Sequence, residues 1–152
     1  GVGQTIQPLV SYNYGSGRKD RVNKFLTLGL IFNISYALIV IIIFLTKSDI
    51  IIELFNKDNE KLRLLTSQNI LKYFSATIFT GINVVIATYI QAQGQGKASS
   101  VIMFFRAFLL MVIGVIVLSK CFGIDGVWYT TLFSEVVTFI GLMIWMKLYK
   151  KN

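Results

Sequence analysis

The chain alternates between long apolar stretches and short polar stretches that carry nearly all of its charges. Residues 25–46 and 73–96 contain no charged residue. At a rise of about 1.5 Å per residue, a helix of this length crosses a hydrocarbon layer about 30 Å thick. We therefore predict two complete transmembrane helices, over residues 25–46 and 64–92, the second of which ends before the glycines at 94 and 96.

Two further apolar stretches each contain one ionisable residue near their middle. Arg106 interrupts residues 98–119 and Glu135 interrupts residues 126–147. We predict a transmembrane helix over each range, although a charged residue in the middle of such a helix costs roughly 3 kcal/mol on insertion scales. Residues 1–14 are predicted to be the end of an earlier helix. The predicted fold class is an all-α integral membrane protein with four complete transmembrane helices and the end of a fifth.

Composition agrees with this class and excludes several functions. Of the 152 residues, 55% are hydrophobic and 14% are charged, whereas roughly 25% of a soluble domain is charged. The net charge of +8 comes from clusters beside the apolar stretches, so nucleic acid is not an expected partner. The single Cys121 and the absence of histidine leave no metal-ligand spacing and no histidine-based catalysis. We expect no metal, no catalytic residue and no cofactor, and the lipid bilayer as a partner.

The positive charges favour one orientation in a cell membrane. If the helices alternate in direction, three basic ends share one side, with Arg18, Lys19, Arg21 and Lys24, then Lys97, then Lys147, Lys150 and Lys151. Acidic residues dilute the basic residues of the other side, which are Lys47, Lys57, Lys61, Arg63 and Lys120. The positive-inside rule places the three basic ends in the cytoplasm, together with the C-terminus. We expect a multi-pass protein of a bacterial plasma membrane.

Residues 47–61 connect the first two complete helices on the opposite side. Their apolar residues, with Ser48 or Asp49 as a helix cap, predict a short amphipathic helix that lies along the outer membrane surface. The alternative is a helical extension of the two transmembrane helices into water.

Three helices have a polar face. In residues 73–91 one arc contains Tyr73, Ala76, Thr77, Thr80, Asn83, Ala87, Thr88 and Gln91. The opposite arc is predicted to face lipid and contains Phe74, Ile78, Phe79, Ile82, Val85, Ile86 and Ile90. The last helix is similar, with Thr130, Thr131, Ser134, Glu135, Thr138 and Gly141 on one side, and in the opening segment Gly3, Gln4, Gln7, Ser11 and Tyr14 share a face. Small and hydroxyl residues either allow close helix packing or line a polar interior.

Four residues are candidates for a substrate or ion cavity: Gln7, Thr80, Asn83 and Glu135. The larger polar groups among them are difficult to bury without water or a partner. Glu135 either binds a proton or Na⁺, or it has a structural role, paired with Arg106 or Lys72 or hydrogen-bonded to Thr and Ser of a neighbouring helix. For Arg106 we expect the side chain to reach toward the cytoplasmic interface.

The opening segment also contains backbone signals. Pro8 lacks a helix donor and predicts a kink or an early helix end. Gly15, Gly17 and Arg18 predict a cytoplasmic turn, and residues 93–99 contain a similar Gly-x-Gly followed by a basic residue. The two segments are better explained as turns than as phosphate loops, and their likeness suggests an internal repeat.

These features together resemble the multidrug and toxic compound extrusion (MATE) family. The opening match is Gly3-Gln4, Gln7-Pro8, Tyr12-Asn13-Tyr14-Gly15, Gly17-Arg18 and Asp20-Arg21-Val22, and IIELFNKDNE, YIQAQGQGK, Arg106 and FGIDGVWYTTLFSE follow in the family's order. The resemblance covers nearly the whole chain. It implies helices eight to twelve of a twelve-helix fold, so that residues 1–152 form part of a C-terminal lobe whose partner is an N-terminal lobe outside this sequence.

The resemblance implies a secondary active antiporter. It would export cationic, amphipathic drugs or toxins in exchange for Na⁺ or H⁺, by alternating access between two lobes. Two departures affect the details: the proline often found in the stretch matching residues 131–134 is absent, and residues 73–91 contain no carboxylate. The coupling ion is therefore open, and we do not expect this chain to transport alone.

Two alternatives to antiport remain open at this point, and a third lacks the residues it would need. A lipid-linked saccharide flippase of the same wider superfamily would favour a more basic interior. A non-transporting membrane scaffold would need no polar helix faces. A membrane-embedded enzyme would need a nucleophile, a base or metal ligands clustered at one depth, and the sequence shows no such cluster.

Overall fold

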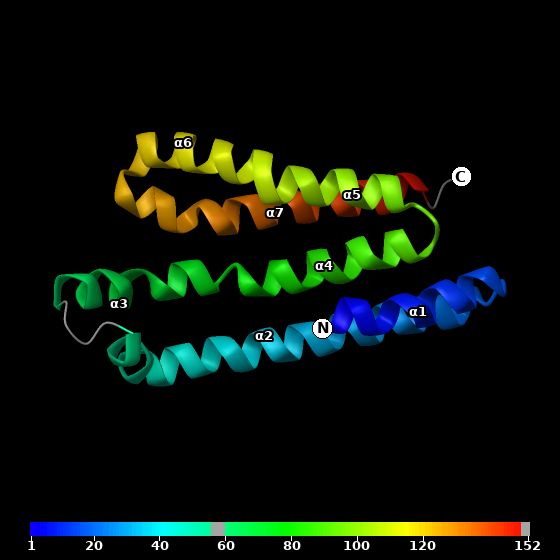
Figure 1. Ribbon diagram of the computed structural model, residues 1–152, viewed down its shortest axis with the longest axis horizontal. Coiled ribbons are helices and arrows are strands. Elements are labelled where there is room, and N and C mark those ends of the chain that lie inside the picture. The colour runs from blue at the N-terminus through cyan, green and yellow to red at the C-terminus, as the bar shows by residue number, and fades with distance from the viewer. Residues whose placement is uncertain (56–59, 150–152) are drawn as a thin grey trace.

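The computed structural model describes residues 1–55 and 60–149, which are helical apart from short turns. The elements run side by side along one long axis (Figure 1). They are α1 (Val2–Gly15), α2 (Lys19–Phe55), α3 (Glu60–Phe74), α4 (Thr77–Ala92), α5 (Gly96–Phe104), the π-helical turn η1 (Phe105–Leu109), α6 (Leu110–Phe122) and α7 (Ile124–Tyr149).

Four segments are long and apolar enough to cross a membrane: Lys19–Ser48, Thr66–Ala92, Gly96–Phe122 and Ile124–Leu148. The predicted all-α class, with four transmembrane helices preceded by one further helix, is confirmed.

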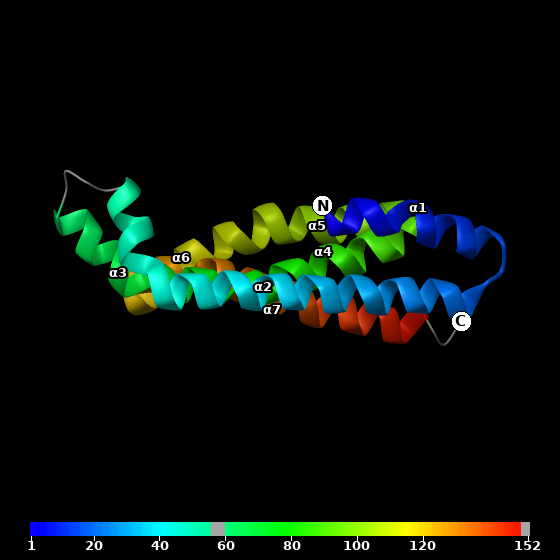
Figure 2. The same ribbon diagram turned by 90° about the horizontal axis from the view of Figure 1, so that it is seen from below.

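Helix α2 is longer at both ends than the predicted helix over residues 25–46. It begins at Lys19 and turns at Lys47, whose φ of −131° is not helical. Beyond Lys47 the helix leaves the direction of its first part (Figure 2). The first part of the predicted connector is therefore helical and continuous with α2. Residues 56–59 of that connector, including Lys57 and Asp58, lie outside the described residues.

The predicted helix over residues 64–92 is divided into α3 and α4 by a turn at Ser75 and Ala76. The Ser75 hydroxyl donates to the Lys72 carbonyl at 2.7 Å, and the Ala76 amide donates to the Tyr73 carbonyl at 3.2 Å. Hydroxyl side chains that bond to nearby carbonyls compete with the helical pattern. The apolar periodicity continues through this turn, so the periodicity alone predicted one helix.

The four spans alternate in direction, which is the condition on which the orientation inferred from the positive charges depends. The turns from α1 to α2 and from α4 to α5 lie at one end of the bundle with the end of α7 (Figures 1 and 2). We call this the basic end, because its described cations are Arg18, Lys19, Arg21, Lys24, Lys97 and Lys147. Lys150 and Lys151 lie outside the described residues. The assignment of the basic end to the cytoplasm stays a prediction.

Two turns at the basic end have the same backbone hydrogen bonds. Gly17 has a φ of +70° and Gly94 a φ of +86°, a region that glycine enters without steric cost. In each turn the glycine amide donates to the carbonyl three residues before it, and the next amide donates to the carbonyl five residues before it. Gly17 is the second glycine of its Gly-x-Gly, whereas Gly94 is the first, so the two turns differ in register.

Helix α1 stays α-helical through Pro8 and ends at Gly15. The predicted early end at Pro8 is therefore wrong, and the predicted kink stays a prediction. The buried face of α1 consists of Gly3, Ile6, Val10 and Asn13. A Cβ atom at Gly3 would lie 2.8 Å from the Thr88 hydroxyl oxygen, so the absence of a side chain lets α1 approach α4 closely.

Helix α4 lies at the centre of the bundle and contacts α1, α2, α5 and α7. Its residues Val85, Ile86 and Ile90 are buried, and Ile86 and Ile90 pack with Leu142 of α7. The prediction that these three residues face lipid is wrong. A helix surrounded on several sides by other helices buries its apolar arc in protein, and a helical wheel cannot distinguish protein from lipid as the apolar neighbour.

Candidate functional site

A buried ion pair joins η1 to α7 in the middle of the bundle. The Arg106 guanidinium donates to both carboxylate oxygens of Glu135, with Nη2 2.5 Å from Oε1 and Nε 3.0 and 2.9 Å from Oε1 and Oε2. The two side chains are 16% and 6% exposed. Glu135 is the eleventh residue after Ile124, the first residue of α7, which places it about 16 Å along the helix. A planar guanidinium on a carboxylate is the strongest common form of such a pair.

Asn83 of α4 completes this cluster. Its amide nitrogen donates to the Glu135 Oε2 atom and to the Glu135 backbone carbonyl, each at 2.8 Å. A carboxylate oxygen and a backbone carbonyl oxygen can only accept hydrogen bonds. The Asn83 side-chain atom that faces them is therefore the amide nitrogen and not the amide oxygen. The Asn83 oxygen is buried and has no partner in the described part of the chain. The cluster of Asn83, Arg106 and Glu135 therefore links three elements and keeps one unused acceptor.

The π-helical turn η1 lies at the arginine of this cluster. A π-helical turn inserts an extra residue and interrupts the regular pattern of backbone bonds, and such turns are frequent at functional sites. The Ser134 hydroxyl of α7 donates to the Arg106 carbonyl at 2.8 Å, so α7 binds both the side chain and the backbone of Arg106. The stretch FFRAFLL contains no Gly or Pro, and nothing in the sequence predicted the π-helical turn.

The predicted polar face of α7 is confirmed at four positions. Thr130, Ser134, Glu135 and Thr138 are all buried. The expectation that Arg106 reaches toward the end of its helix is wrong, because Glu135 offers a carboxylate at the same depth. The alternative that pairs Glu135 with Arg106 is the one that the structure shows, and Lys72 instead binds Asp125 at 2.7 Å.

The structure brings two of the four predicted cavity residues together, Asn83 and Glu135. The Thr80 hydroxyl donates to the Ala76 carbonyl of the same chain segment at 3.0 Å. Gln7 is half-buried on α1. No hydrogen bond recorded for the described residues joins Gln7 or Thr80 to the Asn83–Glu135 pair. Their role in a cavity stays a prediction.

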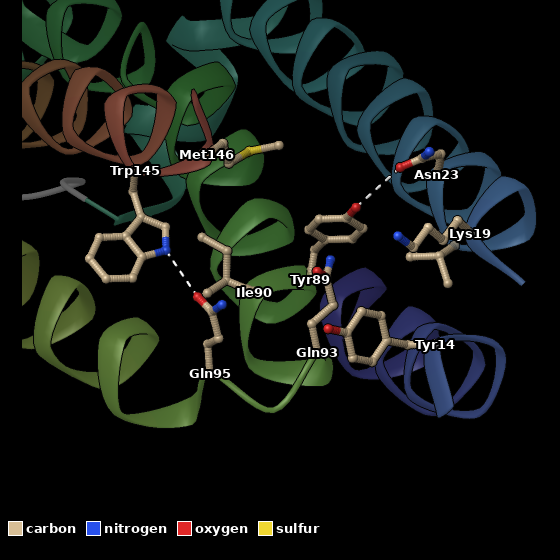
Figure 3. A pocket seen from close by; sticks show the side chains of 10 residues that line it. Tyr14, Lys19, Asn23, Tyr89, Ile90, Gln93, Gln95, Trp145 and Met146 are labelled. Carbon is tan, nitrogen blue, oxygen red and sulfur yellow. Dashed lines mark hydrogen bonds between the residues drawn. The ribbon is translucent and has the colours of Figure 1, made fainter. Parts of the chain in front are cut away.

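A separate cavity of about 410 Å³ lies at the basic end. Figure 3 shows side chains from α1, α2, α4 and α7 around it, together with the turn that follows α4. Its lining residues are Tyr14, Lys19, Val22, Asn23, Tyr89, Ile90, Gln93, Gln95, Trp145 and Met146. None of these residues is predicted from the sequence to form a site. The one sequence signal for this cavity is the grouping of aromatic and amide residues near the ends of helices. That signal is weak, because aromatic residues are common near the ends of spans in any membrane protein.

Comparison with protein families gives one match. The family model described as MatE matches residues 1–116, which extend from α1 into α6 and include Asn83 and Arg106. No curated protein and no solved structure matches the chain.

Proposed function

The chain belongs to the MatE family, and on that premise we propose that it is part of a secondary active antiporter. In this proposal the transporter exports cationic, amphipathic compounds in exchange for Na⁺ or H⁺. The family consists of membrane transporters of the MATE superfamily, which are not enzymes. With its four spans, the chain is a multi-pass membrane protein.

The buried carboxylate of Glu135 carries the proposal. An ion gradient can drive a conformational change only through a group that binds the ion more tightly in one conformation than in another. Glu135 connects α7 to η1 and α4 through Arg106 and Asn83. A proton or Na⁺ on this carboxylate would weaken its attraction to Arg106, and the unused oxygen of Asn83 would be an additional acceptor. Ion binding would therefore favour a different packing of the three elements.

Charge balance supports a cationic cargo. Arg106 is paired with Glu135 and Lys72 is paired with Asp125, so the cations at these two positions are neutralised. A lipid-linked saccharide flippase, which carries an anionic phosphate linkage, would gain from unpaired cations along its path. We place the basic end in the cytoplasm of a bacterial cell. In the same proposal the polar side of α1, with exposed Gln4 and Ser11 and half-buried Gln7, faces an N-terminal lobe.

The first experiment measures export of a fluorescent organic cation by the full-length transporter in cells. The Na⁺ and H⁺ gradients are collapsed in turn with a selective ionophore. Collapse of the coupling gradient should abolish export, and collapse of the other gradient should leave it unchanged. If export continues after both are collapsed, secondary antiport is wrong.

The second experiment replaces Glu135 by Gln, which keeps the shape of the side chain and removes its charge and its proton-binding site. We expect Glu135→Gln to export dye at the background rate when it is compared with the wild type at equal amounts of transporter in the membrane. Lys72→Gln, which changes the exposed ion pair, is the matched control and should export normally. If Glu135→Gln exports dye at the wild-type rate, Glu135 has a packing role and does not couple ion binding to export.

A further inference from the structure

The cavity at the basic end contains hydrogen-bond donors that the protein does not use. The Gln93 amide nitrogen is buried and has no partner among the described residues. Lys19 forms none of the ion pairs found in residues 1–55 and 60–149. A buried donor without an acceptor loses its hydration without compensation. A molecule that fits this cavity should therefore bring acceptor atoms, and a negative charge would suit Lys19.

Four other polar groups of the wall form two hydrogen bonds with one another. Trp145 Nε1 donates to Gln95 Oε1 at 3.1 Å, and the Tyr89 hydroxyl donates to Asn23 Oδ1 at 3.2 Å (Figure 3). The second bond uses the acceptor atom of the Asn23 amide and leaves its NH₂ group as one more donor. The polar part of the cavity is thus biased toward donors.

Electrostatics near the cavity also favour an anion. Lys19 and Asn23 lie in the first two turns of α2, at the end where the helix dipole is positive. Arg18 and Arg21, beside Lys19 in the chain, add positive charge to the same end of the bundle. A small organic cation would meet the Lys19 ammonium, so the cavity is a poor match for the cargo proposed above.

The apolar part of the wall suits an amphiphile at the membrane interface. Val22, Ile90 and Met146 supply aliphatic surface, and the rings of Tyr14 and Trp145 lie beside them. All of these residues lie near helix ends at the basic end of the bundle, and Tyr and Trp are enriched where lipid headgroups meet the hydrocarbon. Basic pockets between transmembrane helices at this depth bind anionic headgroups.

We propose that this cavity binds the phosphate group of an anionic ligand, with Lys19 and Gln93 as donors to the phosphate oxygens. The phosphate comes from an anionic phospholipid of the bilayer or from a soluble phosphate monoester. The site lies at the end of the bundle and is separate from the Asn83–Arg106–Glu135 cluster. The proposal therefore does not depend on antiport and can fail independently of it.

Native mass spectrometry of the full-length transporter in a neutral detergent tests the site. The probes are short-chain phosphatidylglycerol and a diacylglycerol with the same acyl chains, which lacks the phosphate. Because one lysine at an anionic membrane surface contributes about 1 kcal/mol, or about fivefold in affinity, we expect at least this preference for phosphatidylglycerol. Equal binding of the two probes would overturn the proposal. Competition with glycerol 3-phosphate identifies the source: displacement indicates a soluble phosphate, and no displacement indicates a bilayer lipid.

Variants assign the binding to this cavity. Lys19→Gln and Gln93→Leu should each lower phosphatidylglycerol affinity about fivefold, whereas Lys19→Arg should retain it. The matched control is Lys97→Gln, which removes an exposed cation of the basic end that does not line the cavity. Equal losses in Lys19→Gln and Lys97→Gln would show attraction to the basic surface alone and would contradict the proposed site. Thermal unfolding of each variant verifies that the preparations compared are folded.

Discussion

Two ion pairs in this protein combine a basic and an acidic side chain in very different surroundings. Arg106 and Glu135 meet in the middle of the bundle, with side chains 16% and 6% exposed. Lys72 and Asp125 meet at the opposite end from the basic end, with side chains 28% and 57% exposed. The first pair has three hydrogen bonds between its members, and the second has one.

The fold depends on the buried pair of Arg106 and Glu135 more than on the exposed pair of Lys72 and Asp125. Charges taken out of water lose several kcal/mol of hydration, so a buried pair must stay intact once it has formed. An exposed pair keeps most of its hydration and contributes at most about 1 kcal/mol. Lys72 has further partners in Asn69 Oδ1 at 2.7 Å and the Tyr129 ring at 5.5 Å, which lowers its dependence on Asp125. We expect the buried pair to control stability and coupling, and the exposed pair to be dispensable.

The largest effect should come from Glu135→Ala. This change leaves the Arg106 guanidinium buried without a counter-charge and should lower the free energy of unfolding by about 3–5 kcal/mol. The measurement is thermal unfolding of the purified transporter in detergent. The double variant Arg106→Met with Glu135→Leu removes both charges and should recover most of the stability, because apolar side chains of similar volume can replace a buried pair. A Glu135→Ala protein as stable as the wild type would remove the distinction between the two pairs.

An intermediate effect is expected for Asn83→Leu. The change preserves side-chain volume but removes both hydrogen bonds to Glu135, with an expected cost of about 1–3 kcal/mol. The same unfolding experiment measures it, with Thr80→Val as the control, because the Thr80 hydroxyl donates to the nearby Ala76 carbonyl and not to the cluster. If both variants lose the same stability, Asn83 is not a functional part of the cluster.

The smallest effect is expected for Lys72→Gln. The loss of one exposed pair should change the free energy of unfolding by at most about 1 kcal/mol, and 0.5 M salt should reduce the difference further because salt screens exposed charges. Thermal unfolding at low and high salt checks both statements. A loss as large as that of Glu135→Ala would mean that exposure does not separate the two pairs.

The candidate site was predictable in part. Glu135 and Asn83 were selected because large polar groups are costly inside a membrane, and the structure places them in contact. For Glu135, the sequence predicted pairing with Arg106 as one of several alternatives. For Arg106, it predicted a side chain that reaches toward the end of its helix, and that prediction is wrong. A helical wheel with 3.6 residues per turn cannot represent the π-helical turn η1, because its extra residue changes the direction in which every later side chain of the helix points. The cavity at the basic end was missed because its residues come from four helices and a turn, and no one of them is unusual for its place in a span.

The sequence by itself determined the membrane class, the four spans and their alternating directions. These properties depend on local quantities, because each span requires only enough consecutive apolar residues to cross the bilayer, with charges at its ends. It also determined the buried polar face of α7. Three other features depend on how the helices pack and could not be decided from the sequence. Helix α4 is central, its apolar arc packs against protein, and Arg106 bonds to Glu135. Lipid and a neighbouring helix are equally apolar surroundings for a side chain, so hydrophobicity cannot select between them, and helix packing decides the outcome.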